Sequence, residues 1–168
     1  MALTPTRSDP PARTNPPARG TLADRCSIAG TLTALGDTWS IMVLRELFFG
    51  VHRFNDLQRD LGVSRSVLSN RLGRLVDLGV ARAVPYQDPG ERSRLEYRLT
   101  RKGVDLLPVM LSLMDWGDRY LYDGDAPVTV HDRTTDEQVR VEMRTPSGRR
   151  VEPNEMDARV NVPAADGR

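Results

Sequence analysis

The stretch SRSVLSNRLGRL, residues 64–75, combines a helical repeat of apolar residues with an unusual polar surface. Leu68, Leu72 and Leu75 recur at intervals of three and four residues and share one face with Val76, as in an amphipathic helix. The opposite face carries serine, asparagine and arginine but no acidic side chain. Because a solvated helix surface usually mixes both signs of charge, this face is expected to touch a partner.

A short helix precedes this one almost directly. The segment FNDLQRDLG, residues 54–62, has the spacing of a helix that Gly62 ends. Ser64 is placed to cap the next helix, and Gly79 to close it. Two helices joined by so tight a turn are typical of a helix-turn-helix.

The period changes after Gly79. In VARAVPYQDPGERSRLEYRL, residues 80–99, apolar and polar residues alternate on both sides of QDPGERS, whose Pro-Gly pair marks the tip of a hairpin. A strand pair that follows a helix-turn-helix is a wing. The pattern therefore predicts a mainly α-helical fold with a small β wing.

Two helices are expected before this unit. Residues 23–36 space Ile28, Leu32 and Leu35 at helical intervals up to Gly36. In DTWSIMVLRELFFG, residues 37–50, Asp37 or Thr38 can cap a helix that forms the centre of the core. Its expected buried residues are Trp39, Met42, Val43, Leu47 and Phe48.

A long helix is expected after the wing. Thr100 can cap residues 101–122, in which Pro108 should kink the helix or delay its regular start. Apolar residues cover much of its circumference, which is more apolar surface than a small winged domain can bury alone. We therefore expect a homodimer that buries Leu113, Trp116 and Leu121 of this helix.

Composition divides the 168 residues into three parts. Residues 1–21 hold five prolines and are expected to form a disordered arm. Residues 22–122 are expected to form the folded domain, and residues 123–168 an extension with a short hairpin and a frayed acidic tail. No apolar run is long enough to cross a bilayer, and we expect a cytoplasmic protein. Residues 63–82 hold four arginines against one acid, so the basic charge is concentrated in the middle.

These pieces together resemble the HxlR-type winged helix-turn-helix regulators, relatives of the MarR group. The resemblance runs from Cys26 to about Tyr120 and is carried by Cys26, Gly36, Trp39 and the motifs LRELFFG, RFNDL, SRSVLSNRL, LGVARAV, RLEYRLTRKG and LPVM…WGD. Asp37 and Thr38 depart from the Gly-Lys pair common in that family, and Ser27 from its usual proline.

The resemblance implies a dimeric, sequence-specific regulator of transcription, often a repressor that responds to a small molecule or an oxidant. Its expected partner is double-stranded DNA with a pseudo-palindromic operator, and its outer helices would form the dimer. Some longer members build a carboxy-terminal knuckle with cysteines, which are missing here, so no metal is expected there.

The chemistry of the polar face suits DNA. Asn can bond adenine through two hydrogen bonds, Arg can bond guanine, and Ser can donate or accept at either base. Arginines on the wing suit phosphates or the minor groove. The candidate DNA-binding residues are Ser64, Arg65, Ser66, Ser69, Asn70, Arg71 and Arg74 on the helix and Arg92 and Arg94 on the wing.

Cys26 has two interpretations. A lone cysteine at a helix start is usually a small core residue, which is what we expect; an exposed thiol beside Arg25 at a helix amino end would instead suit a sensor. His52 and His131 lie far apart in sequence without metal-ligand spacing, and both are expected at the surface.

Three classes of function remain to be compared. No catalytic arrangement, phosphate loop or dinucleotide motif is present in the sequence, so we expect neither an enzyme nor a cofactor. The remaining alternative to a DNA-binding regulator is a winged helix that binds only proteins, and the acid-free helix face argues against it.

Overall fold

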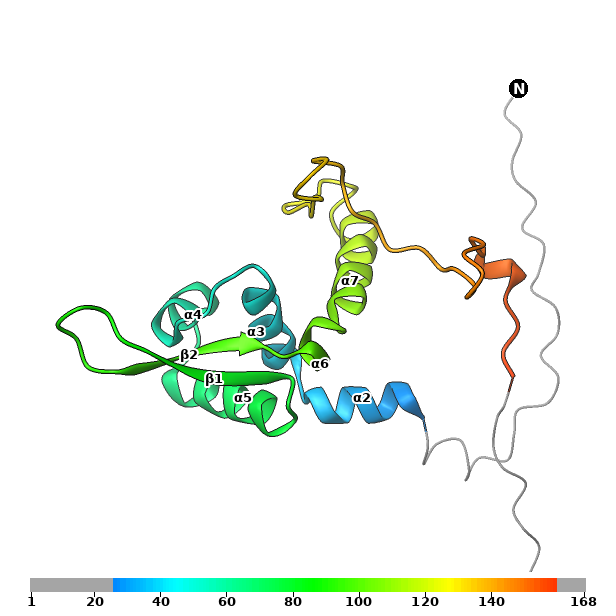
Figure 1. Cartoon of the computed structure of the whole chain (residues 1–168). Coiled ribbons are helices and arrows are strands. Elements are labelled where there is room, and N and C mark those ends of the chain that lie inside the picture. The colour runs from blue at the N-terminus through cyan, green and yellow to red at the C-terminus, as the bar shows by residue number, and fades with distance from the viewer. Residues whose placement is uncertain (1–25, 160–168) are drawn as a thin grey trace, which may run out of the picture. The chain divides into compact units, whose positions relative to one another are not determined.

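A computed structural model of the chain describes residues 26–159 (Figure 1). Residues 30–141 form one compact unit, and residues 26–29 and 142–159 belong to a second. The expected proline-rich arm lies outside the described residues. The elements are α2 (Ser27–Leu35), α3 (Thr38–Phe48), α4 (Phe54–Leu61), α5 (Arg65–Asp77), β1 (Ala81–Tyr86), β2 (Arg94–Leu99), α6 (Arg101–Val104), α7 (Leu107–Tyr120) and a short 3₁₀ turn, η1 (Pro153–Glu155).

The core forms where α3, α4 and α5 meet. α3 is its centre, and Asp37 caps this helix by accepting a hydrogen bond from the backbone N–H of Ser40 at 3.1 Å. The side chains with almost no exposed surface are all aliphatic except Ser40: Val43, Leu44, Leu57, Leu68, Leu72 and Leu75. The predicted fold, mainly helical with a two-stranded wing, is confirmed.

The predicted stripes of α2 and α3 are only partly buried within the chain. Leu35 is buried as expected, but Ile28 and Leu32 of α2 are exposed, and so is Trp39 at the start of α3. The expectation that Trp39 is buried is therefore wrong for the single chain. A helical period shows which residues share a face, but it does not show whether a neighbouring element is long enough to cover that face.

The helix-turn-helix has the predicted boundaries. Gly62 ends α4 in a left-handed conformation, with φ of 64°, which only glycine adopts without strain. Ser64 then caps α5, since its hydroxyl accepts a hydrogen bond from the N–H of Val67 at 3.3 Å. Leu57 and Leu61 of α4 are buried against the core cluster that the α5 leucines share.

The wing is an antiparallel pair whose register runs from Ala81 opposite Leu99 to Tyr86 opposite Arg94. The segment after α3 adds to it, because Arg53 forms a single bridge with Glu96 and the N–H of Tyr97 donates to the His52 carbonyl at 2.9 Å. The wing is thus attached to the helical core along β2.

His52, which we expected at the surface, is only partly exposed. Its Nδ1 atom is buried and has no hydrogen-bond partner among the described residues. Burial lowers the pKa of its imidazole, and the charge of Arg98 lowers it further, while Glu96 and a hydrogen bond with the Tyr97 backbone act in the opposite direction. The segment that holds His52, between α3 and α4, is short and irregular. Its sequence therefore has no periodicity from which a contact of His52 with β2 could be predicted.

Pro108 delays the regular start of the last helix, as predicted. α6 ends at Val104, and α7 begins at Leu107 with Pro108 in its first turn, where a missing N–H costs nothing. Thr100 caps α6 through the N–H of Gly103 at 3.2 Å and also donates to the carbonyl of Gly79 at 2.6 Å. The end of α5 and the start of α6 are therefore held together.

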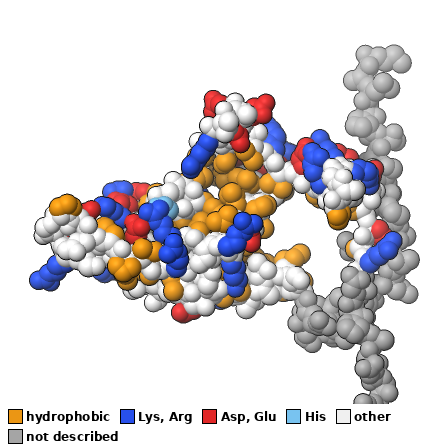
Figure 2. Space-filling model, in the orientation of Figure 1, with side chains coloured by type: hydrophobic (Ala, Val, Ile, Leu, Met, Phe, Trp, Pro, Cys, Tyr) orange, Lys and Arg blue, Asp and Glu red, His pale blue; other side chains and the backbone are white. Residues whose placement is uncertain are grey.

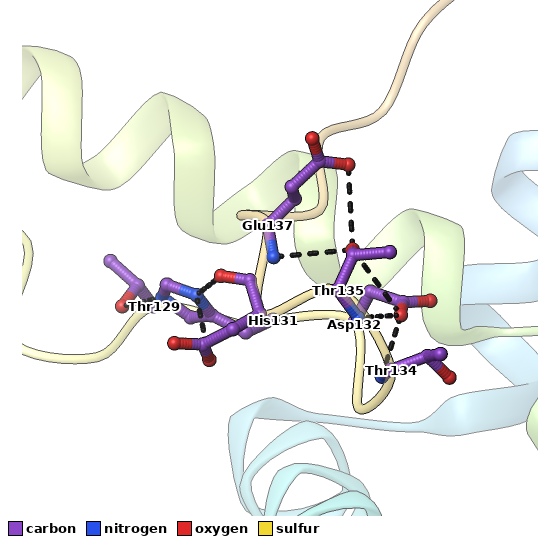
Figure 3. A network of polar contacts seen from close by, with 7 residues as sticks. Thr129, His131, Asp132, Thr134, Thr135 and Glu137 are labelled. Atoms are coloured by element: carbon purple, nitrogen blue, oxygen red, sulfur yellow. Dashed lines mark hydrogen bonds and ion pairs between the residues drawn. The ribbon is translucent and has the colours of Figure 1, made fainter.

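The extension after α7 holds turns with isolated bridges, without regular strands among the described residues. In the turn over residues 131–138, the Asp132 carboxylate accepts hydrogen bonds from the N–H groups of Thr134 and Thr135, which lower its pKa (Figure 3). A second turn brings Arg144 opposite Arg150. Around this second turn, where the short hairpin was expected, the N–H of Val151 donates to the Met143 carbonyl at 2.9 Å, and in the preceding turn the N–H of Val139 donates to the Val130 carbonyl at 2.8 Å.

Candidate nucleic-acid interface

α5 presents three polar residues to the outside. Its buried leucines define an inward face, and at 100° per residue Ser66, Ser69 and Asn70 lie on the other side of the helix, where all three are exposed. The side chains of Ser69 and Asn70 make no hydrogen bond within residues 26–159, whereas the Ser66 hydroxyl lies 3.1 Å from that of Ser64. Ser69 and Asn70 therefore have donors and acceptors free for a partner.

The arginines of α5 divide between its two flanks. Arg65 lies at the amino end, on the side of α4, with its guanidinium 4.9 Å from the centre of the Phe54 ring. Arg71 and Arg74 lie on the other flank and point back to the protein. Of these side chains, Arg65 is the one whose guanidinium makes neither an ion pair nor a hydrogen bond within the described chain.

Arg71 and Arg74 are engaged in ways that the sequence did not indicate. Arg71 forms an ion pair with Asp37, with its Nε 3.0 Å from Oδ1. Arg74 donates from Nε to the carbonyl of Ala34 at 2.8 Å and also to the carbonyl of Thr33, at the end of α2. Our expectation that these two arginines face DNA does not match this arrangement, in which both hold α5 to the preceding helices.

The approach of Arg74 explains the glycine at the end of α2. Gly36 has a φ of 100°, and a Cβ built there would lie 3.0 Å from the Arg74 guanidinium carbon. A larger residue would be strained in backbone and would also push Arg74 aside.

The acids at the tip of the wing are paired with arginines. Arg53 donates to both carboxylate oxygens of Asp88, at 3.0 and 3.2 Å, and its guanidinium lies 4.5 Å from the centre of the Tyr86 ring. Glu91 pairs with Arg94 at 2.8 Å. The tip thus does not present free negative charge, and Arg92 is exposed with no ion pair in the described part of the chain.

Arg53 is the residue of this surface that the sequence analysis missed. It lies 35 positions from Asp88, and its contacts with both Asp88 and Tyr86 form only when the wing folds over the amino end of α4. The available indication in the sequence was the composition of the hairpin tip, which holds two acids beside arginines and so suggests ion pairs there.

The predicted dimerisation residues are exposed. Leu113 and Trp116 are each 56% exposed and Leu121 is 64% exposed, and the ring of Trp116 lies 5.4 Å from that of Tyr120. Hydrophobic side chains gather along this part of the molecule in Figure 2. So much apolar surface on one helix exceeds what scattered surface residues present.

Cys26 is exposed at the start of α2, so our expectation of a core cysteine is wrong for the single chain. Its sulfur accepts a weak hydrogen bond from the N–H of Ala29 at 3.5 Å.

Within residues 26–159 no three His, Cys, Asp or Glu side chains lie close enough to hold a metal ion. No helix in the described ranges has the length and apolar character needed to cross a membrane.

Comparison with known proteins gives consistent matches. A family model described as HxlR-like helix-turn-helix matches residues 34–125. The uncharacterized HTH-type transcriptional regulator Rv3095 of Mycobacterium tuberculosis is 46% identical over 101 residues, which cover 60% of this chain and 63% of that protein. The uncharacterized HTH-type transcriptional regulator YtfH of Escherichia coli is 32% identical over 95 residues, covering 56% of this chain and 74% of its own.

Solved structures agree in fold. The crystal structure of PA1607, described as a candidate transcription factor, superposes with a TM-score of 0.70 at 31% identity and covers 82% of this chain and 96% of that one. The redox regulator HypR in its oxidized form has a TM-score of 0.50 at 26% identity, covering 56% of this chain and 96% of its own.

Proposed function

Because this chain belongs to the HxlR-like helix-turn-helix family of transcriptional regulators, we propose that it binds double-stranded DNA sequence-specifically with α5 in the major groove. One observation carries the proposal: Ser69 and Asn70 are exposed on the outer face of a capped helix, with no hydrogen bond to the rest of the described chain. The only acid in α5, Asp77, is its last residue.

The two parts of the surface have different roles. Asn70 can form two hydrogen bonds with an adenine edge, and Ser66 and Ser69 can bond to neighbouring bases, so the helix sets the sequence preference. Arg92 at the tip of the wing, with Arg94 beside it, bonds to phosphates, which present the same charge in every sequence. Base contacts therefore determine specificity, and wing contacts increase affinity for any DNA.

Titration of two variants on specific and scrambled duplexes tests this division. The specific duplex is selected from a random library with the parent protein. Asn70→Ala is expected to cost about 1 to 3 kcal/mol on the selected duplex and much less on the scrambled one. Arg92→Ala is expected to weaken both by similar factors and to reduce the salt slope by about one unit. Parallel losses and equal slope changes in both variants would overturn base reading by α5.

We also propose that the protein acts as a homodimer on a pseudo-palindromic operator. The exposed apolar surface of α7, with Leu113, Trp116 and Leu121, supports this, because a second copy would remove it from water. A two-fold dimer presents two α5 helices to half-sites about one turn of DNA apart. Failure of the protein to retain any duplex in a gel shift of random genomic fragments would instead favour a winged helix that binds only proteins.

For the effector, we propose an oxidant that acts on Cys26, with a small-molecule ligand as the alternative. The exposed thiol supports this, as does the structural similarity to the redox regulator HypR. A peroxide would oxidise the thiolate to a sulfenic acid and itself be reduced, releasing water or an alcohol. Mild peroxide is expected to weaken operator binding by the parent and to leave Cys26→Ser unchanged; equal losses in both proteins would exclude Cys26 as the sensor.

A further inference from the structure

A concave space of about 330 Å³ separates the amino end of α5 from the wing. We call it the α5–wing groove. Arg65 and Ser69 of α5 line one side, β1 and β2 line the other, and α4 contributes the remaining wall. Its lining residues are Phe54, Asn55, Arg65, Ser69, Tyr86, Arg94, Leu95 and Tyr97.

Aromatic rings hold arginines on both sides of this groove. The Arg65 guanidinium lies over the Phe54 ring, which limits its freedom while its N–H groups stay available, since it makes no ion pair within residues 26–159. On the wing side, Arg53 stacks on Tyr86 and binds Asp88, so the Tyr86 wall is held in place.

The lining is suited to a ligand with an anion next to an apolar face. The Arg65 guanidinium offers a planar fork of donors that matches a phosphate, and Asn55 and Ser69 add neutral polar groups. The rings of Phe54 and Tyr86 offer apolar surface beside them. A sugar–phosphate unit of DNA combines these two properties.

We propose that the α5–wing groove seats one sugar–phosphate unit of the DNA backbone, with Arg65 binding the phosphate and Phe54 acting as its positioning residue. The inference rests on the proposed function, because α5 and the wing are the two elements assigned there to DNA. A backbone strand that passes between them would enter this groove. Ser69, which lines the groove and also belongs to the base-reading face with Ser66 and Asn70, would then link the two.

The test is a double-mutant cycle between Arg65 and single phosphates. In the duplex selected with the parent, each phosphate of one half-site is replaced in turn by a neutral methylphosphonate. At one position the parent is expected to lose about tenfold or more in affinity, and Arg65→Ala to lose almost nothing further. Arg82→Ala, which removes an exposed arginine of β1 outside the groove, is the matched control and should lose the same factor as the parent at that position.

The variant Phe54→Leu tests whether Phe54 positions the Arg65 guanidinium, since it leaves the charge of the groove unchanged. It keeps Arg65 and most of the apolar volume, and we expect the coupling at the same phosphate to fall while sensitivity at the other positions is unchanged. If Phe54→Leu does not fold, as judged by thermal unfolding, the Arg65 cycle alone decides. Equal losses for Arg65→Ala and the parent at every phosphate would overturn the proposal while leaving base reading by Asn70 intact.

A second arm distinguishes DNA from a small anion. Benzoate, an aromatic carboxylate, is titrated calorimetrically into the parent and into Arg65→Ala. Absence of binding agrees with a backbone seat; binding that requires Arg65 and competes with the duplex would identify an effector site and overturn the assignment. If the library yields no duplex at all, the proposed function fails first and this inference fails with it.

Discussion

Arg71 of the proposed recognition helix is paired with Asp37, the residue that caps α3. Asp37 thus has two tasks, because its Oδ1 atom accepts from the Ser40 N–H at 3.1 Å and from the Arg71 Nε at 3.0 Å. Partial burial acts to raise the pKa of Asp37, but the Ser40 hydrogen bond and the charge of Arg71 outweigh it and lower the pKa below 3.8. The orientation of α5 therefore depends on a carboxylate.

Replacement of Asp37 should separate the cap from the ion pair. Asp37→Ala is expected to lower the free energy of unfolding by about 0.5 to 2 kcal/mol because the helix cap is lost, with a small additional loss because the ion pair with Arg71 is lost. Asp37→Asn keeps a capping oxygen and should lose less. Because the folded pKa is depressed, the stabilisation by the carboxylate is present above about pH 3.8 and is lost as the pH falls through the folded pKa. Urea unfolding measures these differences; equal losses in both variants would assign the stabilisation to charge and not to capping.

Two glycines should respond oppositely to alanine. A Cβ on Gly103 would lie 2.2 Å from the backbone carbonyl oxygen of Val80, which directly precedes β1, so Gly103→Ala must displace α6 from Val80. We expect a loss of about 1 to 3 kcal/mol in unfolding free energy. Gly73, in the interior of α5, has no atom within 4 Å of its built Cβ, so Gly73→Ala should gain about 0.5 to 1 kcal/mol. Thermal unfolding of both proteins checks the pair, and a neutral Gly103→Ala would contradict the close packing of α6 on Val80.

His52 should make stability depend on pH. Its folded pKa is lowered, so the unfolded chain binds the proton more readily, and stability is complete above about pH 6.5 and declines as the pH falls toward the folded pKa. The groups that face the ring from β2 are Glu96, the Tyr97 backbone and Arg98. Between about pH 7.5 and about pH 5.5, His52→Gln should lose less of its free energy of unfolding than the parent does, as measured by urea unfolding.

His131→Gln is the matched control for this measurement. His131 lies in an exposed turn, where its ring is 2.9 Å from the Thr129 hydroxyl and 2.8 Å from the Asp136 carbonyl (Figure 3). A change in slope that both variants share would not be specific to His52. A parent whose stability does not change over this range, or a His52→Gln variant with the same slope, would show that His52 does not control the pH dependence.

The exposed face of α7 should control the oligomeric state. Leu113→Glu places a charge in the middle of that face and is expected to convert dimers into monomers, because a buried carboxylate without a partner is costly. Met156→Glu alters a comparably exposed residue near η1, outside α7, and should leave the dimer intact. Sedimentation velocity gives the masses, and a Leu113→Glu protein with the dimer mass would move the interface elsewhere.

Local signals in the sequence were sufficient for the elements and their order. Ser64, Thr100 and Asp37 cap helices where the pattern predicted, and Gly62 ends α4. These features depend on hydrogen bonds between residues at most four positions apart, so neighbouring residues determine them. The buried leucines of α5 were equally predictable, since the period of the helix alone defines the apolar face.

The tertiary structure decided which charges remain available to a partner. In sequence Arg65, Arg71 and Arg74 look alike, yet Arg71 binds Asp37, Arg74 binds the end of α2, and Arg65 stacks on Phe54 at the edge of a groove. The partners of Arg71 and Arg74 lie 34 or more positions away, and the partial burial of His52 likewise depends on a distant strand. The physical reason is that the direction of a side chain follows from its own helix, whereas the group it meets depends on how distant segments pack.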